Sequence, residues 1–126
     1  MDARRGELAG RRVLVVEDEY LLATDLQREL ERRGAEVVGP VAALAEAMAL
    51  ADGAALDAAV LDVNLRGELS FPLADALRAR GVPFAFATGY DREVLPDRFG
   101  DVPRWEKPFD LDRSLDALGA MATRGA

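Results

Sequence analysis

Short apolar runs alternate along this chain with longer segments in which apolar residues recur every three or four positions. The first run, Val13 to Val16, is continuous and rich in β-branched residues, as in a strand that is covered on both faces, and Leu22, Leu26 and Leu30 follow it at helical spacing. Strands that alternate with helices of this length require right-handed parallel crossovers. The sequence therefore predicts an α/β fold with a doubly wound, flavodoxin-like parallel sheet, strand order 2-1-3-4-5, and helices on both faces.

The remaining expected elements repeat this alternation and are bounded by glycines, prolines and capping residues. They are a strand at Val37 and Val38, a helix with Leu44, Met48 and Ala51 that ends at Gly53, a strand from Ala58 to Leu61, a helix with Leu73 and Leu77 that starts near Ser70 and Pro72, strands from Phe84 to Ala87 and from Arg104 to Lys107, and a helix capped by Asp110 with Leu111, Leu115, Leu118 and Ala122. The segment from Tyr90 to Pro103 contains Pro96 and Gly100, so we expect its helix to be short or irregular.

Length and composition limit the classes of function. The 126 residues fit one domain, in which we expect an N-terminal arm at 1–10, a core at 11–123 and no output domain. A net charge of -7 disfavours binding to nucleic acid or an anionic membrane, and the chain has no Cys or His for thiol or imidazole chemistry. Without a signal peptide or a membrane span, we expect a cytoplasmic protein that is a monomer or a weak homodimer.

Polar residues follow four of the predicted strands. They are Glu17-Asp18, Asp62-Val63-Asn64, Thr88-Gly89 and Lys107-Pro108. Doubly wound sheets bind ligands beyond the carboxyl ends of their strands, so these segments are expected to meet. Taken alone, each has an ordinary interpretation as a turn, a cap, a strand residue or a surface charge.

Together these residues suit phosphoryl chemistry with a metal ion. Glu17, Asp18 and Asp62 would repel one another unless a hard cation such as Mg²⁺ lay between them, and Asp62 can act as a nucleophile toward phosphorus. The Thr88 hydroxyl can bond a phosphoryl oxygen, the missing side chain of Gly89 leaves room for the group, and Lys107 can balance the charge.

The chain resembles a response-regulator receiver domain over nearly its whole length, through Val-Leu-Val-Val-Glu-Asp-Glu, Leu-Asp-Val-Asn-Leu, the Thr88 segment and Lys-Pro-Phe. The segment Pro-Phe-Ala-Phe-Ala-Thr-Gly-Tyr at 83–90 is similar to the motif of the FAT GUY group, mostly single-domain receivers that partner with histidine kinases of the HWE and related types. The resemblance also suggests a cis bond before Pro108.

The resemblance assigns a role to each polar position. It implies that Asp62 accepts phosphate from a kinase histidine and that Glu17 and Asp18 are the acid pair, with Asp18 the direct Mg²⁺ ligand. It also implies that Asn64 is a ligand through its backbone carbonyl, that Thr88 is the switch hydroxyl and that Lys107 is the phosphate-pairing cation. Asn64 and Tyr90 would flank the site and tune hydrolysis. Such a domain catalyses its own phosphorylation and dephosphorylation and is not an enzyme acting on other molecules.

The position three residues before Lys107 departs from the receiver pattern. Receivers usually carry Tyr or Phe there, whereas this chain has Arg104, followed by Trp105. Either Trp105, Tyr90 or the 90–103 segment takes over the aromatic switch, or phosphorylation is read out by ordering that segment. The simplest interpretation of Trp105 is core or edge packing.

Two alternatives stay open. A phosphatase of the haloacid dehalogenase kind also uses an Asp nucleophile with Mg²⁺, but its general acid is a second Asp where this chain has Asn64, and no cap domain fits. A binding module that is never phosphorylated has little reason to keep repelling carboxylates together. For a phosphorylated receiver, the output could be a partner protein, onward phosphotransfer or a phosphate sink, and Tyr20 and Gln27 on the first helix are candidates for kinase docking.

Overall fold

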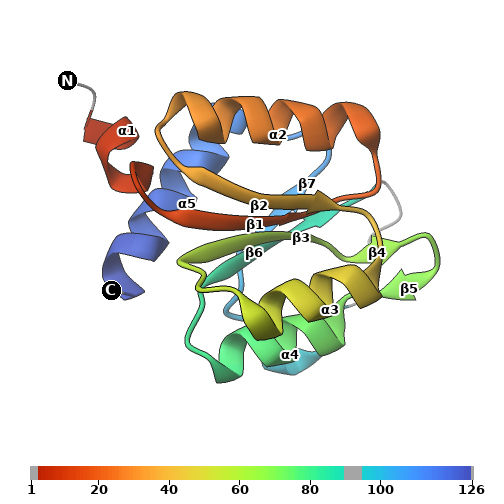
Figure 1. The fold of residues 1–126 in the computed structure, drawn as a ribbon. Helices are drawn as coiled ribbons and strands as arrows, with labels where there is room; N and C mark the ends of the chain where they lie inside the picture. The colour runs from red at the N-terminus through yellow and green to blue at the C-terminus, as the bar shows by residue number, and fades with distance from the viewer. Residues whose placement is uncertain (1–2, 90–94, 126) are drawn as a thin grey trace.

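A computed structural model describes residues 3–89 and 95–125, with only the main chain described at 3–5 and 124–125. Its main sheet has five parallel strands in the order β2-β1-β3-β6-β7, which is the predicted order 2-1-3-4-5 (Figure 1). The strands are β1 (Arg12–Val16), β2 (Glu36–Val41), β3 (Ala58–Asp62), β6 (Phe84–Thr88) and β7 (Arg104–Glu106). The predicted doubly wound α/β fold is confirmed.

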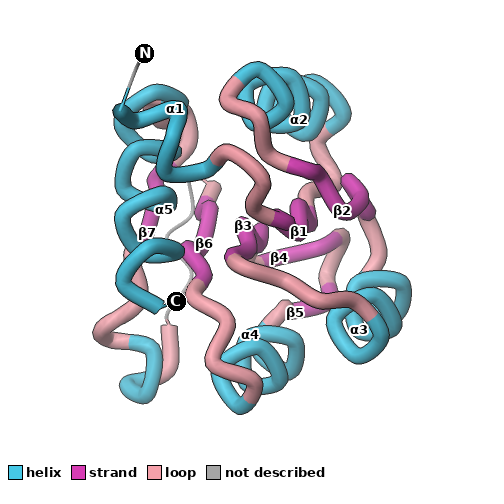
Figure 2. Tube along the Cα trace, turned by 60° about the vertical axis from the view of Figure 1, so that its left-hand side comes forward, coloured by secondary structure: helices cyan, strands magenta, loops and turns pink. Residues whose placement is uncertain are grey.

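Helices cover both faces of this sheet (Figure 2). The helices are α1 (Ala3–Leu8), α2 (Tyr20–Arg32), α3 (Leu44–Gly53), α4 (Phe71–Ala79) and α5 (Leu111–Gly125). Side chains of α1, α2 and α5 share one hydrophobic cluster, and those of α3 and α4 share the other. The cap predicted for α5 is present, because Asp110 Oδ1 accepts the Arg113 N–H at 3.1 Å.

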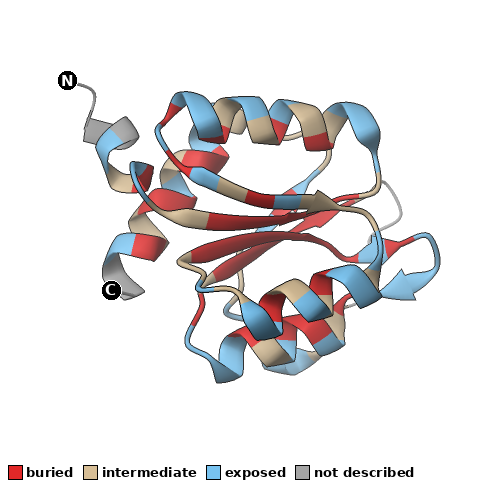
Figure 3. Ribbon diagram, viewed as in Figure 1, coloured by how far each residue is buried: buried red, intermediate tan, exposed pale blue. Residues whose placement is uncertain are grey.

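Strand β1 shows why the apolar runs are continuous. Its side chains alternate between the two clusters, with Val13 and Val15 on the side of α2 and α5 and with Leu14 and Val16 on the side of α3 and α4. All four are fully buried, so a polar residue has no place in the run (Figure 3). This is the burial expected for a parallel strand with helices on both faces.

The N-terminal segment differs from the prediction of an arm. Residues 3–8 form α1, and Leu8 is fully buried in the cluster that also contains Leu115 and Leu118 of α5. A Cβ at Gly119 of α5 would lie 3.1 Å from Glu7 Cβ, so the two helices approach closely there. The core therefore begins before residue 11, because α1 supplies one of its apolar side chains.

A small hairpin after β3 was not predicted. Strands β4 (Asn64–Leu65) and β5 (Glu68–Leu69) pair antiparallel, and the connecting Arg66 and Gly67 both have positive φ, 54° and 93°. Positive φ at both central residues is characteristic of the type I′ turn that suits a tight hairpin. The Asn64 side chain closes the turn, because its Oδ1 accepts the Gly67 N–H at 2.7 Å.

The link between β6 and β7 contains a single-turn 3₁₀ helix in its described part, η1 (Asp97–Phe99), so the prediction of a short helix here is confirmed. Phe99 is fully buried against Phe71, Phe84 and Phe86, with ring centroids 5.4 to 6.3 Å away. One aromatic side chain thus anchors η1 in the core. Tyr90 lies outside the described residues.

Cis peptide bonds occur near the carboxyl ends of two strands, at Gly39-Pro40 and at the predicted Lys107-Pro108. Gly39 has a φ of +96°, and a Cβ there would lie 2.9 Å from the Val41 nitrogen and 3.0 Å from the Val15 oxygen, so only glycine fits this bend in β2. Among the described helices, none has the length and apolar character needed to cross a bilayer.

Candidate functional site

The central strands end at the same edge of the sheet and deliver the site residues there. Glu17 follows β1, whose last residue, Val16, pairs in register with Leu61, the residue before Asp62 on β3. Asp62 is the last residue of β3 and pairs in register with Ala87 of β6. Main-chain pairing therefore fixes the spacing between the acidic segments, as the switch-point argument requires.

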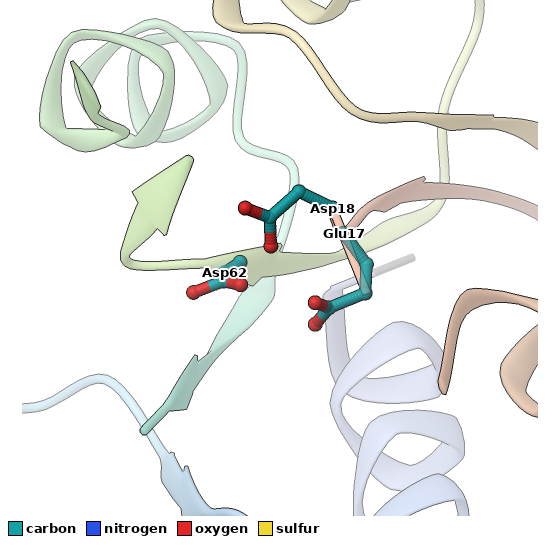
Figure 4. Close-up of side chains that lie close together, drawn as sticks. All are labelled: Glu17, Asp18 and Asp62. Carbon is teal, nitrogen blue, oxygen red and sulfur yellow. The ribbon is translucent and has the colours of Figure 1, made fainter. Parts of the chain in front are cut away.

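Three carboxylates converge at this edge. Each of Glu17, Asp18 and Asp62 offers an oxygen that lies within 4.8 Å of the others (Figure 4). Glu17 and Asp62 are buried, with 3% and 5% of their surface exposed, and Asp18 is half-buried. The predicted meeting of the acid pair with a third carboxylate is confirmed.

Lys107 is the cation of the site. Its Nζ donates to Glu17 Oε2, Glu19 Oε1 and Asp62 Oδ2, each at 3.0 Å. Its own N–H donates to the Thr88 carbonyl at 2.9 Å, which ties the residue after β7 to the end of β6. The ammonium group is thus held by the main chain of the sheet and bridges two buried carboxylates.

Burial dominates the electrostatics of the carboxylates. Burial, followed by the charge of Asp62, raises the pKa of Glu17 from 4.5 to about 8. Burial also raises the pKa of Asp62, against the opposing effect of the hydrogen bond from Lys107. Burial lowers the pKa of Lys107, but hydrogen bonds to Glu17, Glu19 and Asp62 outweigh it and raise that pKa overall, so this ammonium stays charged.

Two buried oxygens at the site, Glu17 Oε1 and Thr88 Oγ1, have no hydrogen-bond partner among the described residues. Thr88 has 1% of its surface exposed, and buried hydroxyl groups are usually paired. An unpaired donor and an unpaired acceptor beside a carboxylate cluster are the atoms that a bound ligand or ion would satisfy.

The site fits a hard divalent cation. The three converging carboxylates supply oxygen ligands, and Glu17 Oε1 is unpaired among the described residues. Lys107 forms ion pairs with Glu17 and Asp62 of this cluster. Mg²⁺ is bound by a few carboxylates while it keeps several waters, and it would offset the mutual repulsion of these groups.

The other predicted residues take varied positions. Gly89 follows Thr88 and lines a pocket of about 390 Å³ together with Lys107. Asn64 contacts the site through its main chain, because its N–H donates to Asp62 Oδ1 at 3.1 Å, while its side chain closes the hairpin. Tyr90, predicted to flank the site, lies outside the described residues.

The sequence analysis missed Glu19 as a site residue. Its Oε1 accepts from Lys107, and its N–H donates to Glu17 Oε2 at 3.0 Å. The available signal was its position directly after the acid pair, but an acidic residue just before a helix also has an ordinary role near the helix N-terminus.

Trp105 packs in the core. It has 8% of its surface exposed, belongs to the cluster of α1, α2 and α5, and its ring centroid lies 5.3 Å from that of Phe109. Arg104, on the neighbouring position of β7, is exposed. The expected core packing of Trp105 is confirmed.

A five-stranded doubly wound sheet whose carboxyl edge carries an acid pair, a third Asp, a Thr and a Lys defines a receiver domain of the response-regulator class. No model of a known protein family matches the chain. Relatives nevertheless span nearly all of it.

SdrG from Sphingomonas melonis Fr1 is 45% identical, with a TM-score of 0.78 over 91% of this chain and 97% of that one. The BeF3-activated conformation of SdrG is 43% identical, with a TM-score of 0.72 over 90% and 98%. The transcriptional regulatory protein TcrA of Mycobacterium tuberculosis is 37% identical over 95% of this chain but only 49% of its own length. The chain thus spans about half of TcrA. It belongs to the response-regulator family of two-component phosphorelay signalling and forms the receiver domain of that family.

Proposed function

We propose that Asp62 is the phosphoacceptor of this receiver and takes a phosphoryl group from a histidine kinase with the help of Mg²⁺. The observation that carries the proposal is the position of Asp62, which is buried at a strand end, bridged to Glu17 by Lys107 and close to Asp18. Lys107 and the Asn64 N–H both donate to the Asp62 carboxylate and so fix its orientation. Positioning of this kind is one of the main contributions that a protein makes to phosphoryl transfer.

In the proposed transfer, a carboxylate oxygen of Asp62 attacks phosphorus in line. The new O–P bond forms as the P–N bond of the phosphohistidine breaks, and the imidazole leaves with the electron pair. Lys107 and the Thr88 hydroxyl, which has no hydrogen-bond partner in the part of the chain that the structure describes, donate to the phosphoryl oxygens. Glu17, Asp18, Asp62 and the Asn64 carbonyl would hold Mg²⁺, which would offset the charge on the transferring group.

The residues near the site support a receiver rather than a phosphatase. A phosphatase of the haloacid dehalogenase kind needs a carboxylic acid two residues after its nucleophile, where this chain has Asn64 with its amide oxygen on the Gly67 N–H. The orientation of Asp62, Lys107 and the unpaired Thr88 hydroxyl also argues against a module that only docks a partner. We infer that the domain catalyses its own phosphorylation and dephosphorylation.

We further propose that a kinase, of the HWE or a related type, docks at the start of α2. Tyr20, with 80% of its surface exposed, and Gln27 line a pocket of about 560 Å³ that also contains Glu17 and Asp18. Next to Tyr20, Leu21 has 77% of its surface exposed. An apolar surface beside the nucleophile suits a partner that must present its histidine there. The domain would act in the cytoplasm, as a monomer or a weak homodimer without nucleic acid, and its output would pass to a partner protein, to onward phosphotransfer or to a phosphate sink.

Intact-mass spectrometry tests the acceptor. Phosphoramidate with Mg²⁺ should add one phosphate to the protein, and chelation of Mg²⁺ should prevent the reaction. Asp62→Ala should stay unmodified, whereas the matched control Asp52→Ala, which removes an exposed carboxylate of α3, should be labelled like the wild type. Equal labelling of Asp62→Ala, or an unchanged mass of the wild type, would refute the proposal.

A further inference from the structure

The ammonium group of Lys107 has no capacity left for a new partner. It carries three N–H bonds, and three carboxylate oxygens, from Glu17, Glu19 and Asp62, lie 3.0 Å from Nζ. A phosphoryl oxygen can therefore receive a hydrogen bond from Lys107 only if one of these contacts is given up.

The three partners of Lys107 differ in exposure. The Glu17 and Asp62 side chains are 1% and 8% exposed, whereas the Glu19 side chain is 61% exposed. Water can replace Lys107 on an exposed carboxylate, but a buried carboxylate that loses its cation is left without compensation. The contact with Glu19 is thus the least costly of the three to break.

Glu19 is nevertheless held close to Lys107. Its N–H donates to Glu17 Oε2, the oxygen that also accepts from Lys107 Nζ. This main-chain contact fixes the start of α2 against the site and directs Glu19 toward the ammonium group. Glu19 does not belong to the carboxylate cluster formed by Glu17, Asp18 and Asp62.

We propose that Glu19 is a positioning residue that retains Lys107 in the unphosphorylated receiver and releases one of its N–H groups when a phosphoryl group occupies Asp62. This inference rests on the proposed function of Asp62. Removal of the Glu19 carboxylate destabilises only the unphosphorylated receiver, because the phosphorylated receiver has already lost the contact. The equilibrium between the two forms then shifts toward the one with a phosphoryl group on Asp62. For an ion pair with one exposed partner, the shift is about two- to fivefold.

Beryllofluoride, a mimic of the phosphoryl group, tests the proposal when it is titrated into the Mg²⁺-loaded protein. The single tryptophan, Trp105, lies two residues before Lys107 and reports binding by its fluorescence. Glu19→Gln, which keeps the side-chain size, and Glu19→Ala should both bind beryllofluoride two- to fivefold more tightly than the wild type.

Asp25→Asn is the matched control for the loss of one negative charge. Asp25 is exposed and lines the same pocket as Glu19 and Lys107, but among the described residues the ion-pair partners of Lys107 are Glu17, Glu19 and Asp62. The affinity of the Asp25→Asn protein for beryllofluoride should stay within about 1.5-fold of the wild-type affinity, as for the loss of an exposed charge without a direct contact.

A second measurement follows Lys107 in the resting protein. The ¹⁵N-detected ammonium signal of Lys107 should be protected from solvent exchange in the wild type and in Asp25→Asn, and should lose protection in Glu19→Gln. This measurement distinguishes loss of the direct contact between Glu19 and Lys107 from a general change in the electrostatic potential at the site.

The outcomes are distinct. Unchanged or weaker beryllofluoride binding by Glu19→Gln, or an equal gain in Asp25→Asn, overturns the role of Glu19 while Asp62 remains the acceptor. If the wild type fails to bind beryllofluoride, or if Asp62→Ala binds it equally well, the proposed function fails and the role of Glu19 fails with it.

Discussion

Lys107 Nζ lies 3.0 Å from Asp62 Oδ2, which joins the residue after the last strand of the sheet to the final residue of its central strand. The same Nζ lies 3.0 Å from Oε2 of Glu17, the residue that follows the neighbouring strand β1. One cation thus holds together two carboxylates that would otherwise repel each other in a buried position.

We expect replacement of Lys107 by Met to destabilise the protein. Glu17 and Asp62 would lose their shared charged donor, a loss of about 1.5–3 kcal/mol in the free energy of unfolding at pH 7. Urea unfolding measures the change. Arg28→Met, which removes an exposed cation from α2, should change stability by less than about 0.5 kcal/mol. Equal stability of Lys107→Met and the wild type would show that the bridge contributes nothing.

The stability of the metal-free protein should fall as the pH rises from 5 to 8. The Glu17 carboxyl has a pKa of about 8 in the folded protein and 4.5 as its ordinary value. Between these two values the folded form binds more protons than the unfolded form, so stability decreases with pH by up to about 1.4 kcal/mol per pH unit. Thermal unfolding in EDTA at several pH values measures the trend.

The stabilisation by Mg²⁺ should therefore be larger at pH 8 than at pH 5. At pH 5 nearly every Glu17 carboxyl carries a proton that competes with the ion, whereas at pH 8, close to the Glu17 pKa, about half of these carboxyls are already deprotonated. The difference in midpoint temperature between Mg²⁺ and EDTA gives the result. In Asp62→Asn, which lacks one of the three clustered carboxylates, this difference should shrink. A stabilisation by Mg²⁺ that does not vary with pH would contradict the raised pKa of Glu17.

Thr88→Val should leave the resting protein as stable as the wild type, or slightly more stable. The Thr88 hydroxyl is buried and has no partner within residues 3–89 and 95–125, so the isosteric valine removes a desolvated polar group and costs no hydrogen bond to these residues. Urea unfolding checks this, and we expect a change in unfolding free energy between 0 and about +1 kcal/mol. Binding of beryllofluoride, in contrast, should weaken because the donor to the phosphoryl group is lost. A marked loss of resting stability would reveal a partner for the hydroxyl.

Phe99→Ala should destabilise the protein by about 3–5 kcal/mol, the usual cost of removing a fully buried Phe. Phe99 is the anchor of η1 and packs against the rings of Phe71, Phe84 and Phe86. Denaturant unfolding measures the loss. Leu69→Ala, at a side chain with 45% exposure, is the control and should cost less than about 1 kcal/mol. A small effect of Phe99→Ala would show that η1 is not anchored in the core.

Much of the fold could be predicted because the apolar pattern carries it. The four β-branched and Leu residues of β1 are buried on both sides, and Leu26 and Leu30 of α2 are fully buried at their predicted spacing. The hairpin of β4 and β5 could not be predicted in this way, because two-residue strands show no periodicity. The burial of Leu8 likewise depends on contacts with α5, more than a hundred residues away.

The sequence by itself determined which chemical groups reach the carboxyl edge of the sheet. Glu17, Asp62, Thr88 and Lys107 lie at or just after the ends of the strands, and the switch-point rule for doubly wound sheets brings these ends together. Only the tertiary structure decided how the groups are paired. The contact between Lys107 and Glu19, the unpaired hydroxyl of Thr88 and the raised pKa of Glu17 depend on distances of about 3 Å and on burial, which arise from the packing of segments far apart in the chain.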